Sequence, residues 1–183
     1  MGLPEKEQQY TYADYCTWDD GERWELIDGV PYAMASPSTT HQRILKKIAV
    51  RLEIFLEGKP CEVFIAPYDV RLNAAENTVV QPDLLVVCDG EKIDDRGCKG
   101  APDMVIEILS PSTAAHDRFR KFNAYQNAGI REYWIVDPDY RTVQVHILEN
   151  GRYFIKIHGE TDKIPVFVLE GCEISLPDVF ADV

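Results

Sequence analysis

The sequence predicts a mixed α/β (α+β) fold, in which a central mixed β-sheet is flanked by helices. Strand-like segments outnumber helical ones, and helical segments separate some of the strands. Residues 104–109 form a nearly continuous apolar run, which is typical of a central strand buried on both faces. These observations favour a layered sandwich over an all-helical or all-strand protein.

The first third of the chain is predicted to contain a short helix, a hairpin and a long helix. Asp28-Gly29 is a strong signal for a two-residue hairpin. From His41 onward, apolar residues recur at helical spacing, and Gly58 ends this helix. The predicted segments are a helix at 12–18, strands at 24–27 and 30–35, and a helix at 41–56.

Strands dominate the rest of the chain, with one more long helix. This helix is predicted to begin at Ser110-Pro111-Ser112-Thr113 and to end before Gly129. Asn150-Gly151 marks a second hairpin. The charged, glycine-bounded segment 90–100 is predicted to be a mobile surface loop, and 73–78 an exposed one. The predicted strands are 61–66, 68–72, 83–87, 104–109, 132–136, 141–149, 152–157, 165–169 and 173–175.

Length and composition indicate one ordinary globular domain, and the cysteines favour the cytoplasm. With 183 residues, 45% hydrophobic and 27% charged, we expect a single domain at 10–183 after a flexible segment at 1–9. No apolar run approaches the length of a membrane span. The five cysteines show no C-x-x-C spacing, and no signal peptide is evident, so we expect reduced thiols in a cytoplasmic protein.

The net charge of −12 weighs against tight binding of duplex DNA. Affinity for nucleic acid comes largely from neutralising phosphates, which usually leaves a basic footprint on the protein. A local basic cleft can still exist on an acidic protein, so a nucleic-acid substrate remains open.

Two carboxylates stand out because they lie at the head of one predicted strand and inside the next. Asp83 precedes an apolar run, and Glu107 interrupts the apolar run 104–109. A carboxylate inside a central strand is costly unless it is paired or bound to a metal, and two such groups can share one hard cation. The alternatives are an ion pair of Glu107 with a buried arginine or a helix N-terminus, and a turn-bonding role for Asp83.

The helix after Glu107 adds a candidate cation. Asp117, Lys121 and Tyr125 share one face at i, i+4 spacing, whereas Phe119, Phe122 and Ile130 are predicted to be core. Because the helix follows the strand closely, Lys121 could hold an attacking water or stabilise charge on a phosphate. The alternative is a solvated lysine paired with Asp117.

These residues resemble a large bacterial family of restriction-endonuclease-like proteins in the PD-(D/E)XK nuclease superfamily. Many of its members carry only a domain-of-unknown-function label. The resemblance extends from Tyr10 to about Val179. It rests on W-E-L-I-D-G-V at 24–30, S-P-S-T-T-H at 36–41, P-D-L-L-V-V at 82–87, V-I-E-I-L-S-P-S-T at 105–113 and the stretch D-R-F-R-K-F-N-A-Y-Q-N-A-G-I-R-E-Y-W-I-V-D-P at 117–138.

The resemblance implies a restriction-endonuclease-like fold with Asp83 and Glu107 as the two acidic motif positions. The lysine expected two residues after Glu107 is absent, because Leu109 stands there. The family takes its lysine from the following helix, which here is Lys121. This displacement puts the superfamily's usual geometry of water activation in question.

Three further residues match family positions. Glu25 corresponds to an acidic position that binds metal directly or through water, with an ordinary strand glutamate as the alternative. His41 either contacts phosphate or caps its helix, and capping is the favoured interpretation. Asp117 is a possible auxiliary residue.

The resulting hypothesis is a metal-dependent endonuclease acting on DNA. Mg²⁺ or Mn²⁺ would be held by Asp83, Glu107 and the carbonyl of Ile108, and Lys121 would assist attack on phosphorus, leaving a 5′-phosphate. One alternative is a catalytically quiet nuclease fold that serves as a binding module. Another keeps the site but acts on small nucleotides or on single-stranded or branched nucleic acid. A homodimer is possible, and target choice would depend on loops such as 90–100.

Overall fold

The computed structural model describes residues 9–110 and 116–183, without the side chains of 116–118. The predicted flexible segment 1–9 therefore lies outside the described residues except for Gln9. The predicted helix start at 110–113 lies outside them except for Ser110. None of the helices in the described part of the chain has the length and apolarity needed to cross a bilayer.

The main sheet is mixed, which confirms the predicted fold class. Its strands are β3 (Glu62–Ile65), β6 (Leu84–Val87), β9 (Met104–Ile108), β10 (Glu132–Asp137), β11 (Thr142–Glu149) and β12 (Arg152–Gly159). Their order is β12-β11-β10-β9-β6-β3. β9 and β10 are parallel, and the other neighbours pair antiparallel.

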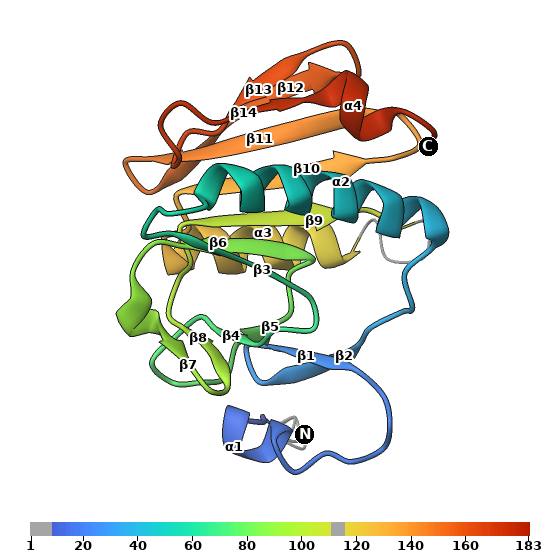
Figure 1. Ribbon diagram of the computed structural model, residues 1–183. Coiled ribbons are helices and arrows are strands. Elements are labelled where there is room, and N and C mark those ends of the chain that lie inside the picture. The colour runs from blue at the N-terminus through green and yellow to red at the C-terminus, as the bar shows by residue number, and fades with distance from the viewer. Residues whose placement is uncertain (1–8, 111–115) are drawn as a thin grey trace.

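Both faces of the main sheet are covered, which explains the apolar runs of its central strands. Helix α2 (Thr39–Leu56) lies on one face and α3 (His116–Ala128) on the other (Figure 1). Along β6, Leu84 and Val86 pack in the cluster formed with α2, and Leu85 and Val87 in the cluster that holds residues of α3. Successive strand residues point to opposite faces, so a strand buried on both sides needs apolar residues throughout.

A second sheet lies beside the α3 face. Its strands are β1 (Trp24–Ile27), β2 (Val30–Ala33), β4 (Val70–Arg71), β5 (Val79–Val80), β7 (Ile93–Asp94) and β8 (Gly97–Lys99), in the order β2-β1-β5-β4-β8-β7. The short helix α1 (Tyr12–Tyr15) lies on the side of this sheet away from the main sheet (Figure 1). A small hairpin of β13 (Lys163–Pro165) and β14 (Glu173–Ser175) precedes α4 (Leu176–Phe180), which contacts α2.

The prediction of a mobile loop at 90–100 is wrong. A 3₁₀ turn, η1 (Gly90–Lys92), leads into β7 and β8, and β8 pairs in parallel with β4. Cys98 is buried, although most of its neighbours are charged and exposed. A side chain at Gly97 would meet the carbonyl oxygen of Asp69 at 2.1 Å, so this glycine permits the close pairing. The charges therefore mark the outer face of a paired hairpin.

Other predictions differ from the structure near short or exposed segments. The strand expected at 68–72 is reduced to Val70–Arg71, β5 was not expected, and 165–169 contains only the last residue of β13. Phe119 is 71% exposed, so its assignment to the core is wrong, whereas Phe122 and Ile130 do pack against the core. Two-residue strands carry too little periodicity to be recognised in the sequence.

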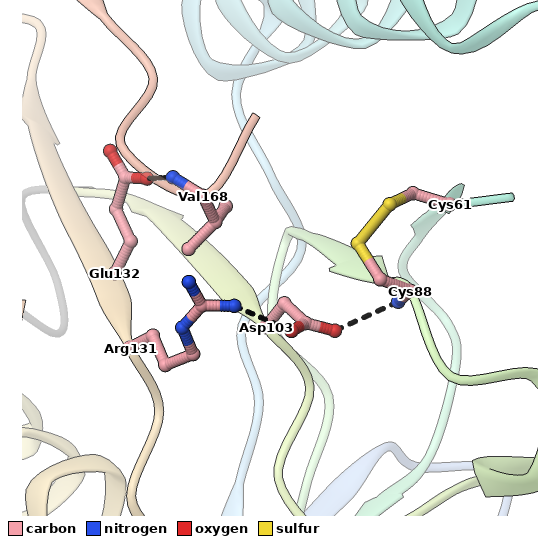
Figure 2. The surroundings of a disulfide bond; sticks show 6 residues. All are labelled: Cys61, Cys88, Asp103, Arg131, Glu132 and Val168. Atoms are coloured by element: carbon pink, nitrogen blue, oxygen red, sulfur yellow. Dashed lines mark hydrogen bonds and ion pairs between the residues drawn. A yellow bond between two sulfur atoms is a disulfide. The ribbon is translucent and has the colours of Figure 1, made fainter. Parts of the chain in front are cut away.

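The prediction of five reduced thiols is also wrong, because Cys61 and Cys88 form a disulfide (Figure 2). Cys61 precedes β3 and Cys88 follows β6, and the register pairs Glu62 with Val87. Continuing this antiparallel register brings the two cysteines opposite each other. They are separated by 27 positions, so sequence spacing alone does not reveal the pair. Cys16, Cys98 and Cys172 are free.

Candidate active site

Strand pairing brings Asp83 and Glu107 together. β6 and β9 are antiparallel, with Leu84 opposite Ile106, so Asp83 lies beside Glu107 one step further along the same register. The Ile108 backbone N–H donates to Asp83 Oδ2 at 2.7 Å. The Asp83 carboxylate therefore accepts from the backbone of the neighbouring strand β9 rather than from a turn.

Helix α3 and strand β1 bring a lysine and a third carboxylate to the same place. Lys121 Nζ lies 3.0 Å from Glu107 Oε1 and 2.9 Å from Glu25 Oε1. The side chains of Lys121, Glu107 and Glu25 are only 11%, 13% and 7% exposed. Tyr125, one turn after Lys121, donates its hydroxyl to Glu107 Oε1. Lys121 is thus a buried cation paired with two glutamates rather than a solvated lysine. The predicted alternative partner, the side chain of Asp117, lies outside the described residues.

His41 belongs to this cluster but does not cap its helix. Its Nε2 lies 3.0 Å from Asp83 Oδ1. The N-cap of α2 is Ser38, whose hydroxyl accepts the His41 backbone N–H. The favoured capping role of the imidazole is therefore wrong. His41 Nδ1 is buried and has no hydrogen-bond partner among the described residues.

The electrostatics of the cluster follow from burial and crowding. Burial raises the pKa of Glu107 to about 7; Asp83 and Glu25 add to the rise, and Lys121 opposes it. Burial lowers the pKa of Lys121, but the two glutamates outweigh this and hold it above its usual value. Lys121 therefore stays charged at neutral pH beside an excess of carboxylates.

The cluster lines a cavity of about 130 Å³, which we call the carboxylate cavity. Its wall includes Asp83, Glu107, Glu25, Lys121 and His41. Carboxylate oxygens are the ligands that hard divalent cations prefer, so the donor chemistry fits Mg²⁺ or Mn²⁺. In the described part of the chain, no three His, Cys, Asp or Glu side chains are arranged as a metal site. A cation here would therefore need further oxygen ligands from the backbone, water or substrate.

Two residues around the cavity were not predicted from the sequence. Gln81 donates its backbone N–H to Glu25 Oε1 at 2.8 Å, and its side-chain oxygen accepts from Arg23. Arg23 also lines the cavity. The only available signal was position, since Gln81 stands two residues before Asp83 and Arg23 two before Glu25.

Comparison with solved structures identifies the class of fold. The chain is similar to a crystal structure from Anabaena variabilis described as a putative nuclease belonging to DUF820. The TM-score is 0.78 at 19% identity, and the match covers 94% of this chain and 98% of that one. This likeness shows a nuclease-like fold.

Sequence comparison identifies the family. The family model of Uma2, described as putative restriction endonuclease, matches residues 11–177, and the chain belongs to this family. Two Synechocystis relatives, the uncharacterized proteins slr1290 and sll1609, are each 28% identical over 155 and 120 residues. The matches cover 82% and 63% of this chain and 81% and 67% of the relatives. Membership supports a nuclease-like function.

Proposed function

We propose that this protein is a metal-dependent endonuclease that hydrolyses phosphodiester bonds of DNA. The observation that carries the proposal is the position of Lys121, which bridges Glu107 and Glu25 at the wall of a cavity that Asp83 also lines. A buried ammonium among carboxylates, open to a cavity, suits a phosphate-cleaving site better than a structural ion pair.

Asp83, Glu107 and the carbonyl of Ile108 would hold Mg²⁺ or Mn²⁺. When bound, such an ion supplies Lewis acidity toward a phosphate and lowers the pKa of a bound water. The three protein oxygens leave positions for water and for a phosphate oxygen, in keeping with the way Mg²⁺ is usually held. Glu25 is a further candidate, acting directly or through water.

Lys121 would position the attacking water or stabilise charge that develops on the phosphate oxygens. Because the two glutamates raise its pKa, the ammonium stays protonated throughout the neutral range. Two residues position the acids: the Tyr125 hydroxyl donates to Glu107, and the His41 imidazole contacts Asp83. Fixing the acids in this way reduces the reorganisation needed when substrate binds.

The test is cleavage of labelled DNA with Mn²⁺ or Mg²⁺ by the wild type and by Asp83→Ala. We expect the variant to lose activity by about 100-fold or more, because it removes a proposed metal ligand. Asp95→Ala is the matched control, since Asp95 is an exposed aspartate in the β7–β8 turn. Full cleavage activity in Asp83→Ala would overturn the proposal.

A catalytically quiet binding module is the second candidate, and the net charge of −12 favours it. Weak attraction for phosphates suits a nuclease fold that has acquired another partner. The two candidates differ in one measurement. The binding module predicts no cleavage of duplex, single-stranded or branched substrates with either metal, even when the protein is folded.

A further inference from the structure

A second hollow, of about 440 Å³, is lined by residues of α1 and of the second sheet. Helix α1 lies on the side of that sheet away from the main sheet (Figure 1). We call it the aromatic pocket because Tyr12, Tyr15, Trp18 and Trp24 line it. The ring centroids of Tyr15 and Trp18 are 5.6 Å apart, and those of Trp18 and Trp24 are 6.0 Å apart. Both tryptophans are only half-buried, so part of each indole is open to the pocket and to solvent.

The aromatic pocket and the carboxylate cavity lie on opposite faces of β1 and meet at one residue. Arg23 lines both hollows. Trp24 and Glu25 are consecutive residues of β1 and so point to opposite faces of the sheet, one into each hollow. Gln81 connects the two sides, because its backbone N–H donates to Glu25 and its side-chain amide donates to the Tyr15 hydroxyl at 2.9 Å. Because Arg23 directly precedes β1, a strand bound in the carboxylate cavity would have to pass Arg23, at the end of β1, to place a base in the aromatic pocket.

The charged groups that line the aromatic pocket balance one another. Asp69 and Glu22 are offset by Arg23 and Arg96, so the feature that distinguishes this pocket is its aromatic rings, which suit an uncharged base. Arg23, at the junction, donates to the neutral side-chain oxygen of Gln81 at 2.7 Å and 3.1 Å. This partner does not cancel the positive charge of the guanidinium. The arrangement therefore suits a phosphate beside Arg23 and a base among the aromatic rings.

The overall charge makes stacking the more effective source of affinity. Duplex binding depends on many phosphate contacts, which a protein of net charge −12 provides poorly. Stacking of a base on an aromatic ring needs no basic surface and accepts any base, since every base has a π-face. A base inside a duplex is already stacked on both faces and cannot enter the pocket without leaving the helix.

We propose that the aromatic pocket binds an unpaired nucleobase of the strand whose phosphate lies in the carboxylate cavity. The preferred substrate is then single-stranded or locally opened nucleic acid rather than continuous duplex. This inference rests on the proposed nuclease function for the identity of the ligand as nucleic acid.

The test is fluorescence titration of a short single strand that carries 2-aminopurine, a base analogue that is quenched when it stacks. The strand and its duplex are titrated with the full chain, once with EDTA and once with Ca²⁺. We expect the wild type to quench the single strand in at least one condition and to bind the duplex about tenfold more weakly. Trp18→Leu should weaken single-strand binding by about tenfold, and Trp18→Phe, which keeps a ring, by no more than about twofold.

Tyr140→Leu is the matched control, because Tyr140 is 81% exposed and outside both hollows, and it should bind as the wild type does. Thermal unfolding of each variant identifies any loss of binding caused by misfolding, and Trp18→Phe keeps the test valid if Trp18→Leu is unstable. The inference is overturned if the wild type quenches nothing, if duplex and single strand bind equally, or if folded Trp18→Leu binds like the wild type.

Cleavage assays separate this inference from the proposed nuclease function. If cleavage requires Asp83 but is equal for both substrates and unchanged by Trp18→Leu, the nuclease function is supported and the role of the aromatic pocket is contradicted. If stacking depends on Trp18 but no substrate is cleaved, base binding in the aromatic pocket is supported and the nuclease function is contradicted.

Discussion

Two glutamates on neighbouring parallel strands show the difference between a structural carboxylate and a candidate catalytic one. Glu132 begins β10, and its carboxylate accepts the Trp134 indole N–H at 2.8 Å. It also accepts the Val168 backbone N–H at 2.9 Å (Figure 2). Glu107 lies near the end of β9 and contacts Lys121 and Tyr125 at an open cavity. Burial raises the pKa of both acids. The partners of each carboxylate and the cavity beside Glu107 therefore distinguish the two acids, and the direction of the pKa shift does not.

The same contrast separates the two ends of the main sheet. The disulfide, Glu132 and the Asp103–Arg131 ion pair gather at one end (Figure 2). Asp83 and Glu107 lie at the other, where β6 begins and β9 ends. We expect substitutions at the first end to change stability and substitutions at the second to change activity.

The largest expected effect is a fall in the rate of DNA cleavage when Glu107 is replaced in the variant Glu107→Gln. Losing the charge while keeping the shape should lower activity by about 100- to 1000-fold, because a proposed metal ligand becomes a neutral amide. Glu132→Gln is the matched control. It should keep activity within about twofold while losing about 1–2 kcal/mol of unfolding free energy, because its accepting carboxylate is replaced by an amide. The measurements are initial cleavage rates and urea unfolding, and equal activity loss in both variants would break the comparison.

The second-largest expected effect is on stability, at the end of the main sheet that holds the disulfide. Cys61→Ser combined with Cys88→Ser should lower the free energy of unfolding by about 3 kcal/mol, as expected for opening a loop of this length in the unfolded chain. Activity at a temperature where the protein is folded should not change. Cys16→Ser, which removes an exposed free thiol, is the control. An unchanged unfolding curve for the double variant would show that the cross-link contributes nothing to stability.

The smallest effect is expected at His41, which contacts Asp83 rather than the substrate. His41→Gln should lower activity by about tenfold and raise the Mn²⁺ concentration needed for half-maximal activity, as is typical when a group that orients a metal ligand is lost. His158→Gln replaces another buried histidine far along the chain and should leave both quantities unchanged. A lower rate with no change in Mn²⁺ dependence would contradict the positioning role.

The long elements were predictable because each contains several turns or residues of regular spacing. The apolar spacing after His41 identified α2, and the apolar run around Glu107 identified β9 as central. Short strands were missed or misplaced. The 90–100 segment shows why: only two of its residues, Gly97 and Cys98, are buried, and the surrounding charges suggest a loop. Local composition cannot show that a distant backbone such as β4 supplies the hydrogen bonds.

The sequence by itself determined the mixed fold, the family and the residue types of the candidate site. These follow from periodicity and from motifs along the chain, which are local properties. Only the tertiary structure decided which groups meet. Glu25 and Glu107 both pair with Lys121, His41 contacts Asp83, and Cys61 forms a disulfide with Cys88. The aromatic pocket is likewise formed only in the folded chain. Each of these pairs depends on strand register and helix placement, which are set by long-range packing, because hydrogen-bonded strands are neighbours in space and not in sequence.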